Sequence, residues 1–200
     1  MKRSSSILLG FIACALALAG PVRAGGTAFT DAGAGLSGLF SASTAWGDYD
    51  SDGDLDIAVV GRTVAGPIAR IYRNTSGAFS NALALPAGAA VSEGAVAWGD
   101  YNRDGDLDLA IAGDTGAGIV TKIFRNTGGA FADAGAGLPG VKDCALSWAD
   151  FDNDGDLDLA LAGDTGAAHL GRIYRNTAGS FADASAGLLG VSRASMAWAD

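Results

Sequence analysis

The chain has 200 residues, of which 49 % are hydrophobic and 18 % charged. This composition is too apolar for a disordered chain, so we expect a packed core. The formal net charge is -9 and no basic stripe interrupts it, which argues against a nucleic-acid-binding surface. Beyond the N-terminal segment no apolar run reaches the roughly 18 residues of a membrane-spanning helix, so we expect no membrane span in the mature chain.

Residues 1–24 have the features of a signal peptide. Two basic residues precede an apolar stretch over residues 7–19, and a small-x-small cleavage site ends at Ala24. We therefore expect a protein that is secreted or exposed on the cell surface, with lipoprotein cleavage at Cys14 as the alternative processing. Only Cys144 remains after cleavage at Ala24, which excludes an intramolecular disulfide. Alanine or glycine stands at its place in the other repeat copies, so we expect a small packed side chain rather than a reactive thiol.

The rest of the chain is an internal repeat with a period of about 50 residues. An Asp-Leu-Asp triplet, an Arg-Asn-Thr triplet and a phenylalanine follow one another at constant spacing in three successive copies. Each copy begins with a tryptophan that is followed by glycine or alanine and then aspartate. These tryptophans are Trp46, Trp98, Trp148 and Trp198.

Each copy is predicted to form four short strands and no helix. In the second copy the strands are expected at residues 95–99, 107–112 and 121–125 and around Phe131. The second strand is apolar on both faces, which indicates a sheet packed between other sheets. Asn-Thr-Gly-Gly supplies a hairpin turn between the third and fourth strands. Four-stranded units that repeat and stack are typical of a β-propeller, so the predicted fold class is all-β.

The repeat sets the predicted blade boundaries. We expect three blades at residues 44–91, 92–141 and 142–191, and residues 192–200 are the expected start of a truncated blade. Residues 25–43 are predicted to supply an N-terminal strand to another blade, because their sequence matches the fourth-strand region of the second copy. The chain is therefore expected to be a fragment of a larger ring, which that strand closes.

Acidic residues are concentrated in three nine-residue windows, which hold 14 of the 22 aspartates and glutamates. Each window falls between the first and second strands of a copy. Oxygen ligands at positions 1, 3, 5 and 9, with a glycine at position 6, suit a hard cation such as calcium, and position 7 is expected to give its backbone carbonyl. Without an ion the clustered carboxylates repel one another. We predict about three calcium ions, one per window, held by Asp48, Asp50, Asp52, Asp54, Asp56, Asp100, Asn102, Asp104, Asp106, Asp108, Asp150, Asp152, Asp154, Asp156 and Asp158.

The spacing differs from that of an EF-hand, because position 12 holds a strand residue instead of a bidentate acid. The sequence Trp-Gly-Asp-Tyr-Asp-Ser-Asp-Gly-Asp-Leu-Asp at residues 46–56 resembles FG-GAP repeats, also called VCBS-type repeats, of secreted bacterial proteins and of the integrin α-chain propeller. The resemblance covers residues 25–200. It implies a propeller, typically seven-bladed, with calcium in the hairpins and interaction surfaces elsewhere. Asn102 replaces aspartate at position 3 and keeps an oxygen ligand, so we expect weaker binding there, not loss.

Three other motifs have competing interpretations. Asp-Thr-Gly at residues 114–116 and 164–166 is also the triplet of aspartic proteases, but the two copies lie one repeat apart and are predicted to be turns. His169 has no serine or cysteine at a matching repeat position, which favours an exposed loop residue. The tryptophans are expected to pack between blades rather than to stack on sugars.

Two functions follow. The first is a non-catalytic, calcium-binding extracellular propeller that mediates adhesion by binding a protein or glycan, where binding is what the family resemblance implies. The alternative is the propeller scaffold of a secreted polysaccharide-degrading enzyme, with catalytic residues outside this fragment. Glu93 and His169 are each the only residue of their type, so we expect no acid–base catalysis from this segment and no catalytic residues in it.

Overall fold

The computed structural model describes residues 30–199, apart from the side chains of Ala82 and Ala84. The predicted signal peptide lies outside these residues. The chain divides into two units, Met1–Ala32 and Gly33–Asp200, and every described strand belongs to the second. Within residues 30–199 the structure contains strands and no helix, and therefore no helix of the length and apolarity needed to span a membrane.

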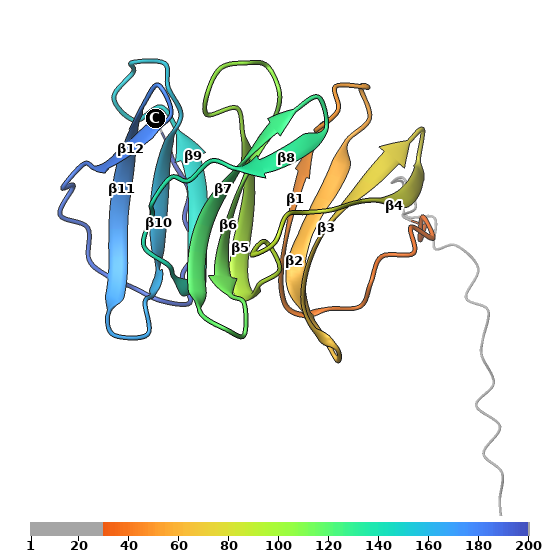
Figure 1. Cartoon of the computed structure of the whole chain (residues 1–200), viewed down its shortest axis with the longest axis horizontal. Helices are drawn as coiled ribbons and strands as arrows, with labels where there is room; N and C mark the ends of the chain where they lie inside the picture. Colours follow the sequence, from red (N-terminus) through yellow and green to blue (C-terminus); the bar gives the residue numbers. More distant parts are fainter. Residues whose placement is uncertain (1–29, 200) are drawn as a thin grey trace, which may run out of the picture. The chain divides into compact units, whose positions relative to one another are not determined.

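The second unit contains three antiparallel sheets of four strands, each in simple sequence order, which we call the first, second and third blades (Figure 1). The first blade consists of β1 (Phe40–Gly47), β2 (Asp56–Thr63), β3 (Gly66–Thr75) and β4 (Ala78–Ala84). The second consists of β5 (Ser92–Gly99), β6 (Asp108–Asp114), β7 (Ile119–Thr127) and β8 (Ala130–Asp133). The third consists of β9 (Lys142–Ala149), β10 (Asp158–Asp164), β11 (His169–Thr177) and β12 (Ser180–Asp183). The predicted all-β fold class and its four-stranded units are confirmed.

The predicted hairpin between the third and fourth strands is also confirmed. In the second blade Thr127 pairs with Ala130, which leaves Gly128 and Gly129 as a two-residue turn with φ angles of +56° and +89°. Two successive residues in the left-handed region form the type of turn whose twist matches that of the strands it joins. The equivalent turns are Ser76-Gly77 and Ala178-Gly179, again with positive φ at both residues.

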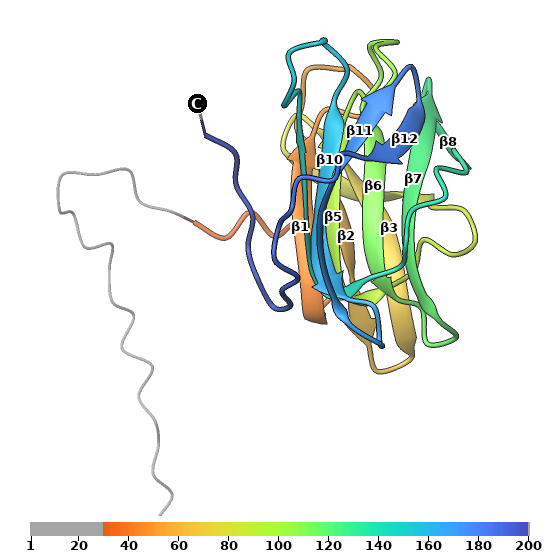
Figure 2. The ribbon, with the colours of Figure 1, turned by 90° about the vertical axis from the view of Figure 1, so that its left-hand side faces the viewer.

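The blades stack in chain order, with β1 against β5 and β5 against β9, and Figure 2 views this stack end-on with the third blade toward the viewer. Strand β6 is buried on both faces. Its large residues Leu109 and Ile111 pack into a cluster with Val60 of the first blade, whereas Ala110 packs with Leu159 of the third. Because bulky and small residues alternate, one face of each blade fits the opposite face of the next. This agrees with the sequence-based prediction of a sheet packed between sheets.

Trp98 and Trp148 pack between blades, as predicted. Trp98 stacks on Tyr49 of the preceding blade, with the ring centroids 6.3 Å apart, and its Nε1 donates to the carbonyl oxygen of Ala45 at 3.1 Å. Trp148 makes the equivalent contacts with Tyr101 and with the carbonyl oxygen of Ala97. Trp46 belongs to the first blade and is 58 % exposed.

Of residues 25–43, which are predicted to supply an N-terminal strand, residues 25–29 lie outside the described residues, residues 30–39 carry no strand, and β1 begins at Phe40. Gly33 and Gly35 have φ angles of +62° and +61°, close to the +66° of Gly135 and Gly137 in the connection between the second and third blades. At these two glycines the segment that enters β1 therefore has the same φ as a connection between blades. Ring closure by the preceding residues stays a prediction.

Cys144 lies in the first strand of the third blade and packs against the facing strand β10. A Cβ built on the facing Gly163 would lie 2.6 Å from the Cβ of Cys144. Burial raises the pKa of the Cys144 thiol to about 12. Since the thiolate is the reactive form, the structure supports the prediction of an inert, packed cysteine.

We predict that Cys144 in the folded protein reacts with iodoacetamide at pH 8 on the order of a thousandfold more slowly than an exposed thiol, because the thiolate fraction falls with the raised pKa. Peptide mapping by mass spectrometry measures the alkylation of this residue. The same protein in denaturant is the control. Native and denatured rates within about tenfold of each other would contradict the packed assignment.

The contact between blades also predicts the effect of enlarging a glycine. A Cβ on Gly99 would lie 2.7 Å from Cδ1 of Trp148, so Gly99→Val should lower the free energy of unfolding by about 2 kcal/mol through overpacking. Gly118→Val is the matched control, because a Cβ there meets no atom within 4 Å. Urea unfolding of the two variants measures the difference. Equal losses would show that the indole does not pack on this glycine.

Candidate metal-binding loops

The three acidic windows form the hairpin loops between the first and second strands of the blades, as predicted. We call them the first (48–56), second (100–108) and third (150–158) acidic loops. The glycine at position 6 has φ near +91° in every loop, a conformation that favours glycine. A Cβ on Gly53 or Gly105 would meet no atom within 4 Å, so backbone conformation rather than crowding accounts for the glycine.

The aspartate at position 1 holds each loop together from within. In the first loop both carboxylate oxygens of Asp48 accept backbone N–H bonds, from Asp52 at 3.0 Å and from Gly53 at 2.9 Å. Asp100 and Asp150 accept the same two bonds in their loops. The turn that brings positions 3 and 5 together is therefore formed by the loop's own carboxylate.

Carboxylates converge in the first and third loops. One oxygen from each of Asp48, Asp50 and Asp52 lies within 4.8 Å of the others, and Asp150, Asp152 and Asp158 form an equivalent group. In the first group Oδ1 of Asp50 is buried and has no hydrogen-bond donor. The other oxygen of Asp50 pairs with Arg73, but Oδ1 keeps its lone pairs free for a ligand bond, so the donor set fits a hard cation such as calcium.

The second loop differs at position 3. The side-chain amide of Asn102 donates to Oδ2 of Asp104 at 2.9 Å, and its Oδ1 accepts the backbone N–H of Asp104 at 3.0 Å. The Asn102 amide thus donates to an expected calcium ligand, at the same oxygen that pairs with Arg125, which an aspartate at position 3 could not do. This supports the expectation of weaker binding in this loop.

The aspartate at position 9 is fully buried in all three loops. Asp108 accepts backbone N–H bonds from Asn126 at 2.8 Å and from Tyr101 at 3.3 Å. Burial nevertheless raises the pKa of Asp108 to about 6, and burial raises the pKa of Asp56 and Asp158 as well. Two amides do not fully replace the lost hydration of the carboxylate, so a nearby cation would stabilise its charged form.

The aspartate at position 7 has a role that spacing did not indicate. Its side chain reaches the hairpin turn between the third and fourth strands. Asp54 accepts the backbone N–H of Ser76 at 2.6 Å, and Asp106 accepts that of Gly128 at 2.8 Å. Asp156 does the same with Ala178 at 3.0 Å. The side chain thus joins two hairpins of one blade, while the expected role of the backbone carbonyl as a ligand stays a prediction.

An arginine from the Arg-Asn-Thr triplet lies beside each loop. Arg73 pairs with Asp50 at 2.7 Å and with Asp52 at 2.9 Å. Arg125 pairs with Asp104, and Arg175 with Asp152. The backbone N–H of Asp54 and the Arg73 guanidinium together hold the pKa of Asp52 below its usual range. The repeated triplet is a visible signal in the sequence, but its asparagine and threonine predict only the hairpin turn and leave the arginine without a role.

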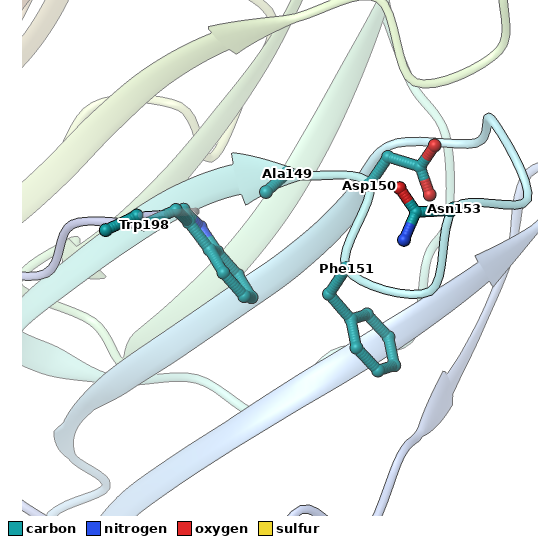
Figure 3. A pocket seen from close by; sticks show the side chains of 6 residues that line it. Ala149, Asp150, Phe151, Asn153 and Trp198 are labelled. Carbon is teal, nitrogen blue, oxygen red and sulfur yellow. The ribbon is translucent and has the colours of Figure 1, made fainter.

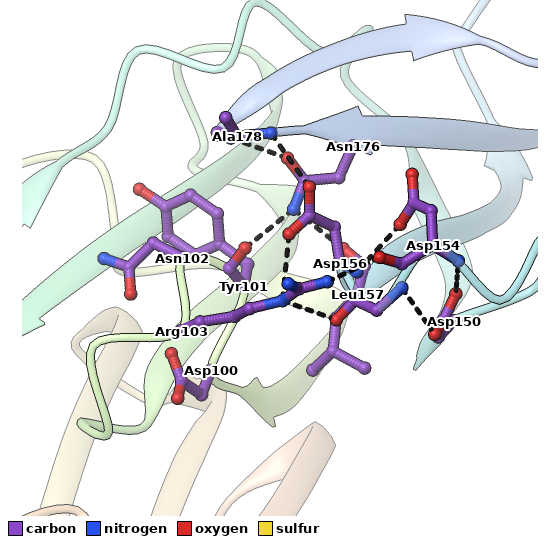
Figure 4. A network of polar contacts seen from close by, with 12 residues as sticks. Asp100, Tyr101, Asn102, Arg103, Asp150, Asp154, Asp156, Leu157, Asn176 and Ala178 are labelled. Atoms are coloured by element: carbon purple, nitrogen blue, oxygen red, sulfur yellow. Dashed lines mark hydrogen bonds and ion pairs between the residues drawn. The ribbon is translucent and has the colours of Figure 1, made fainter.

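The asparagine of the same triplet connects neighbouring blades. Nδ2 of Asn126 donates to the carbonyl oxygen of Tyr49 in the first blade at 2.8 Å, and also to Leu107 within its own loop. Asn176 donates in the same way to the carbonyl oxygen of Tyr101 at 2.7 Å, as Figure 4 shows. Both asparagines are fully buried. Each therefore ties the acidic loop of one blade to that of the next.

The remaining motifs lie apart from these loops. The Asp-Thr-Gly triplets end β6 and β10 and form turns, with the backbone N–H of Gly116 bonded to Oδ1 of Asp114 at 2.7 Å. These bonds confirm the turn prediction. The two triplets belong to different blades. His169 is exposed at the start of β11, with Nε2 3.5 Å from the Ser192 hydroxyl.

A hollow adjoins the third acidic loop (Figure 3). It is bordered by Asp150 and Asn153 of the loop and by the rings of Phe151 and Trp198. Ala149 stands here in the place that Gly47 and Gly99 occupy in the other blades. In the first two blades the tryptophan of the following repeat packs on this glycine. The hollow thus lies at the equivalent position of the third blade.

The repeated blades and their acidic hairpins agree with a comparison to family models. The model of the FG-GAP-like repeat matches residues 48–111 and 100–161, and each match begins at position 1 of an acidic loop. The chain belongs to the FG-GAP-like repeat family, which confirms the resemblance found in the sequence. A comparison with curated proteins finds no match.

The contact between loops predicts a difference between two asparagines. Asn126→Ala should lower the free energy of unfolding by about 1–2 kcal/mol more than Asn74→Ala, because the variant leaves the buried Tyr49 carbonyl without its donor. Asn74 is the matched control, because its side chain makes the bonds within the blade to Leu55 and Gly77. Urea unfolding measures both variants. Equal losses would show that the bond between blades adds nothing to stability.

Proposed function

We propose that the chain is a non-catalytic, calcium-binding extracellular module of the β-propeller type, which mediates adhesion by binding a protein or glycan. The observation that carries the calcium assignment is the first acidic loop. Three carboxylates converge there within 4.8 Å, and Oδ1 of Asp50 is buried without a donor. The FG-GAP-like repeat match supports the assignment, because this repeat type commonly carries calcium.

The ion would be held by side-chain oxygen atoms of the residues at positions 1, 3, 5 and 9 and by the backbone carbonyl oxygen at position 7. A bound dication supplies positive charge that removes the repulsion among them. The role of the ion in this proposal is structural. Asp108 and Asp158 connect each loop to the third strand of its blade, and Asn126 and Asn176 connect it to the preceding blade. Binding in a loop therefore stabilises its blade and the adjoining interface.

An extracellular location is consistent with this use of calcium. Residues 1–24 have the pattern of a signal peptide, and the rest of the chain contains a single cysteine, Cys144. Without a disulfide, bound ions provide another way to stabilise an exported domain. Calcium outside cells is abundant enough to occupy sites with dissociation constants on the order of 0.1–1 mM.

The binding role rests on the repeat family and on how this chain uses its charged residues. The aspartates of the acidic loops accept backbone N–H bonds and pair with arginines. We assign no catalytic residue to this segment. A protein or glycan partner is the proposed ligand of the faces outside the acidic loops.

The calcium assignment predicts coupled binding and folding. The melting temperature should rise with calcium and fall with excess chelator, by an amount that corresponds to about 1–3 kcal/mol per site at 10 mM calcium. Thermal unfolding followed by circular dichroism measures the shift. An unchanged melting temperature would contradict the assignment.

A pair of variants localises the effect. Asp152→Ala should weaken the third site most and leave the first site unchanged, because blades contact only their neighbours. Asp164→Ala is the control, since Asp164 lies in a turn of the same blade and bonds to Gly166. Isothermal titration should show weaker binding in the first variant, with at least one site unchanged, and unchanged binding in the second. Loss of binding in all loops would contradict separate sites.

A further inference from the structure

Arg103 reaches from the second acidic loop into the third (Figure 4). Its Nε lies 2.7 Å from the carbonyl oxygen of Gly155, and its Nη2 lies 2.9 Å from that of Asp154. The same Nε lies 3.1 Å from Oδ1 of Asp156. The guanidinium thus contacts three successive residues of a loop in the neighbouring blade.

This arm is specific to one pair of loops. Position 4 has a left-handed backbone in every loop, with φ angles of +57° at Ser51, +58° at Arg103 and +59° at Asn153. The backbone is the same, but serine and asparagine are shorter than arginine. A long residue is rarely found at such a φ, so its presence here calls for a reason in its side chain.

The contacted turn lies next to the expected ligands of the third loop. Asp150 holds it from inside the loop, through the backbone N–H groups of Asp154 and Gly155. Arg103 holds it from outside, through the carbonyl groups of the same two residues. A Cβ on Gly155 would lie 2.1 Å from the guanidinium, so glycine leaves room for the arm. The peptide group between Asp154 and Gly155 is therefore held on both sides.

We propose that Arg103 is a positioning residue that orders the third acidic loop from the second blade and makes its calcium affinity depend on the second loop. This inference rests on the calcium-binding function proposed above. Ordering the turn before the ion arrives removes part of the entropy cost of binding. The opposing repulsion between guanidinium and ion is screened, because the side chain is half exposed and already pairs with Asp156.

The coupling follows from the position of Arg103. Its backbone belongs to the second loop, so an ion there fixes the base of the arm, and the arm fixes the turn in the third loop. Two sites that bias one shared element are coupled in both directions. The first loop presents only Ser51 to the second, so no equivalent arm joins those two.

Each loop provides its own reporter, the amide of its position-6 glycine. Calcium titration followed by two-dimensional NMR of Gly53, Gly105 and Gly155 gives one dissociation constant per loop. Arg103→Ala should weaken the Gly155 response about five- to tenfold and leave that of Gly53 unchanged. It should also speed amide exchange of residues 154–155 in metal-free protein, a readout that needs no ion. Arg103→Lys should show the same losses as Arg103→Ala, because lysine lacks the planar guanidinium that contacts both carbonyl groups.

Arg172→Ala is the matched control, since Arg172 is an equally exposed arginine of the third blade that pairs with Asp183. A second experiment tests the coupling itself. Asp100→Asn, which removes one charge from the second loop and weakens its ion site, should weaken the Gly155 response in the natural chain but not further in Arg103→Ala. Ser51→Arg should create the missing arm and tighten the Gly105 response.

The outcomes separate the inference from the function on which it rests. If the glycines of the natural chain respond to calcium but Arg103→Ala leaves the Gly155 constant unchanged or tighter, Arg103 does not position the loop. Additive effects of Asp100→Asn and Arg103→Ala would overturn the coupling. If no glycine amide of the natural chain responds to calcium, the proposed calcium function itself fails and the coupled affinity fails with it.

Discussion

The buried carboxylate at position 9 of each acidic loop is the constraint on which the rest of the structure depends. Asp108 lies at the start of β6, is fully buried and accepts the backbone N–H of Asn126 in β7. The side chain of Asn126 then reaches the Tyr49 carbonyl of the preceding blade. A carboxylate removed from water must be compensated, so the loop, the third strand and the interface between blades form one hydrogen-bonded unit.

This hydrogen-bonded unit explains why each four-stranded sheet carries an acidic loop. A four-stranded blade cannot bury both of its faces alone, and stacked neighbours supply the missing contacts. The apolar part of the interface comes from the tryptophan of one blade, such as Trp148, which packs on a glycine of the preceding blade, Gly99. The polar part comes from the side-chain amide of an asparagine such as Asn176. In the proposed function an ion in the loop stabilises the carboxylates that both parts surround, so calcium acts on the stacking of blades as well as on a hairpin.

Much of this architecture was predictable because it is encoded at short range. Four strands per repeat, the hairpin turn, the packing of Trp98 and the place of the acidic loops follow from local periodicity and a fixed repeat. The roles of Asp106, Asn126 and Arg103 did not follow, because their partners lie 22, 77 and 52 residues away and belong to other hairpins or blades. A repeat shows that a residue is retained between copies, but not which neighbour it contacts.

Native-state hydrogen exchange of the backbone amides of Asn126 and Asn176, measured with calcium and with chelator, tests this account most directly. These amides donate to Asp108 and Asp158, so they report the buried carboxylates themselves. The account predicts that calcium slows their exchange together with that of the amides in the second and third acidic loops. Calcium binding that protects the loops but leaves the two asparagine amides unchanged would contradict it.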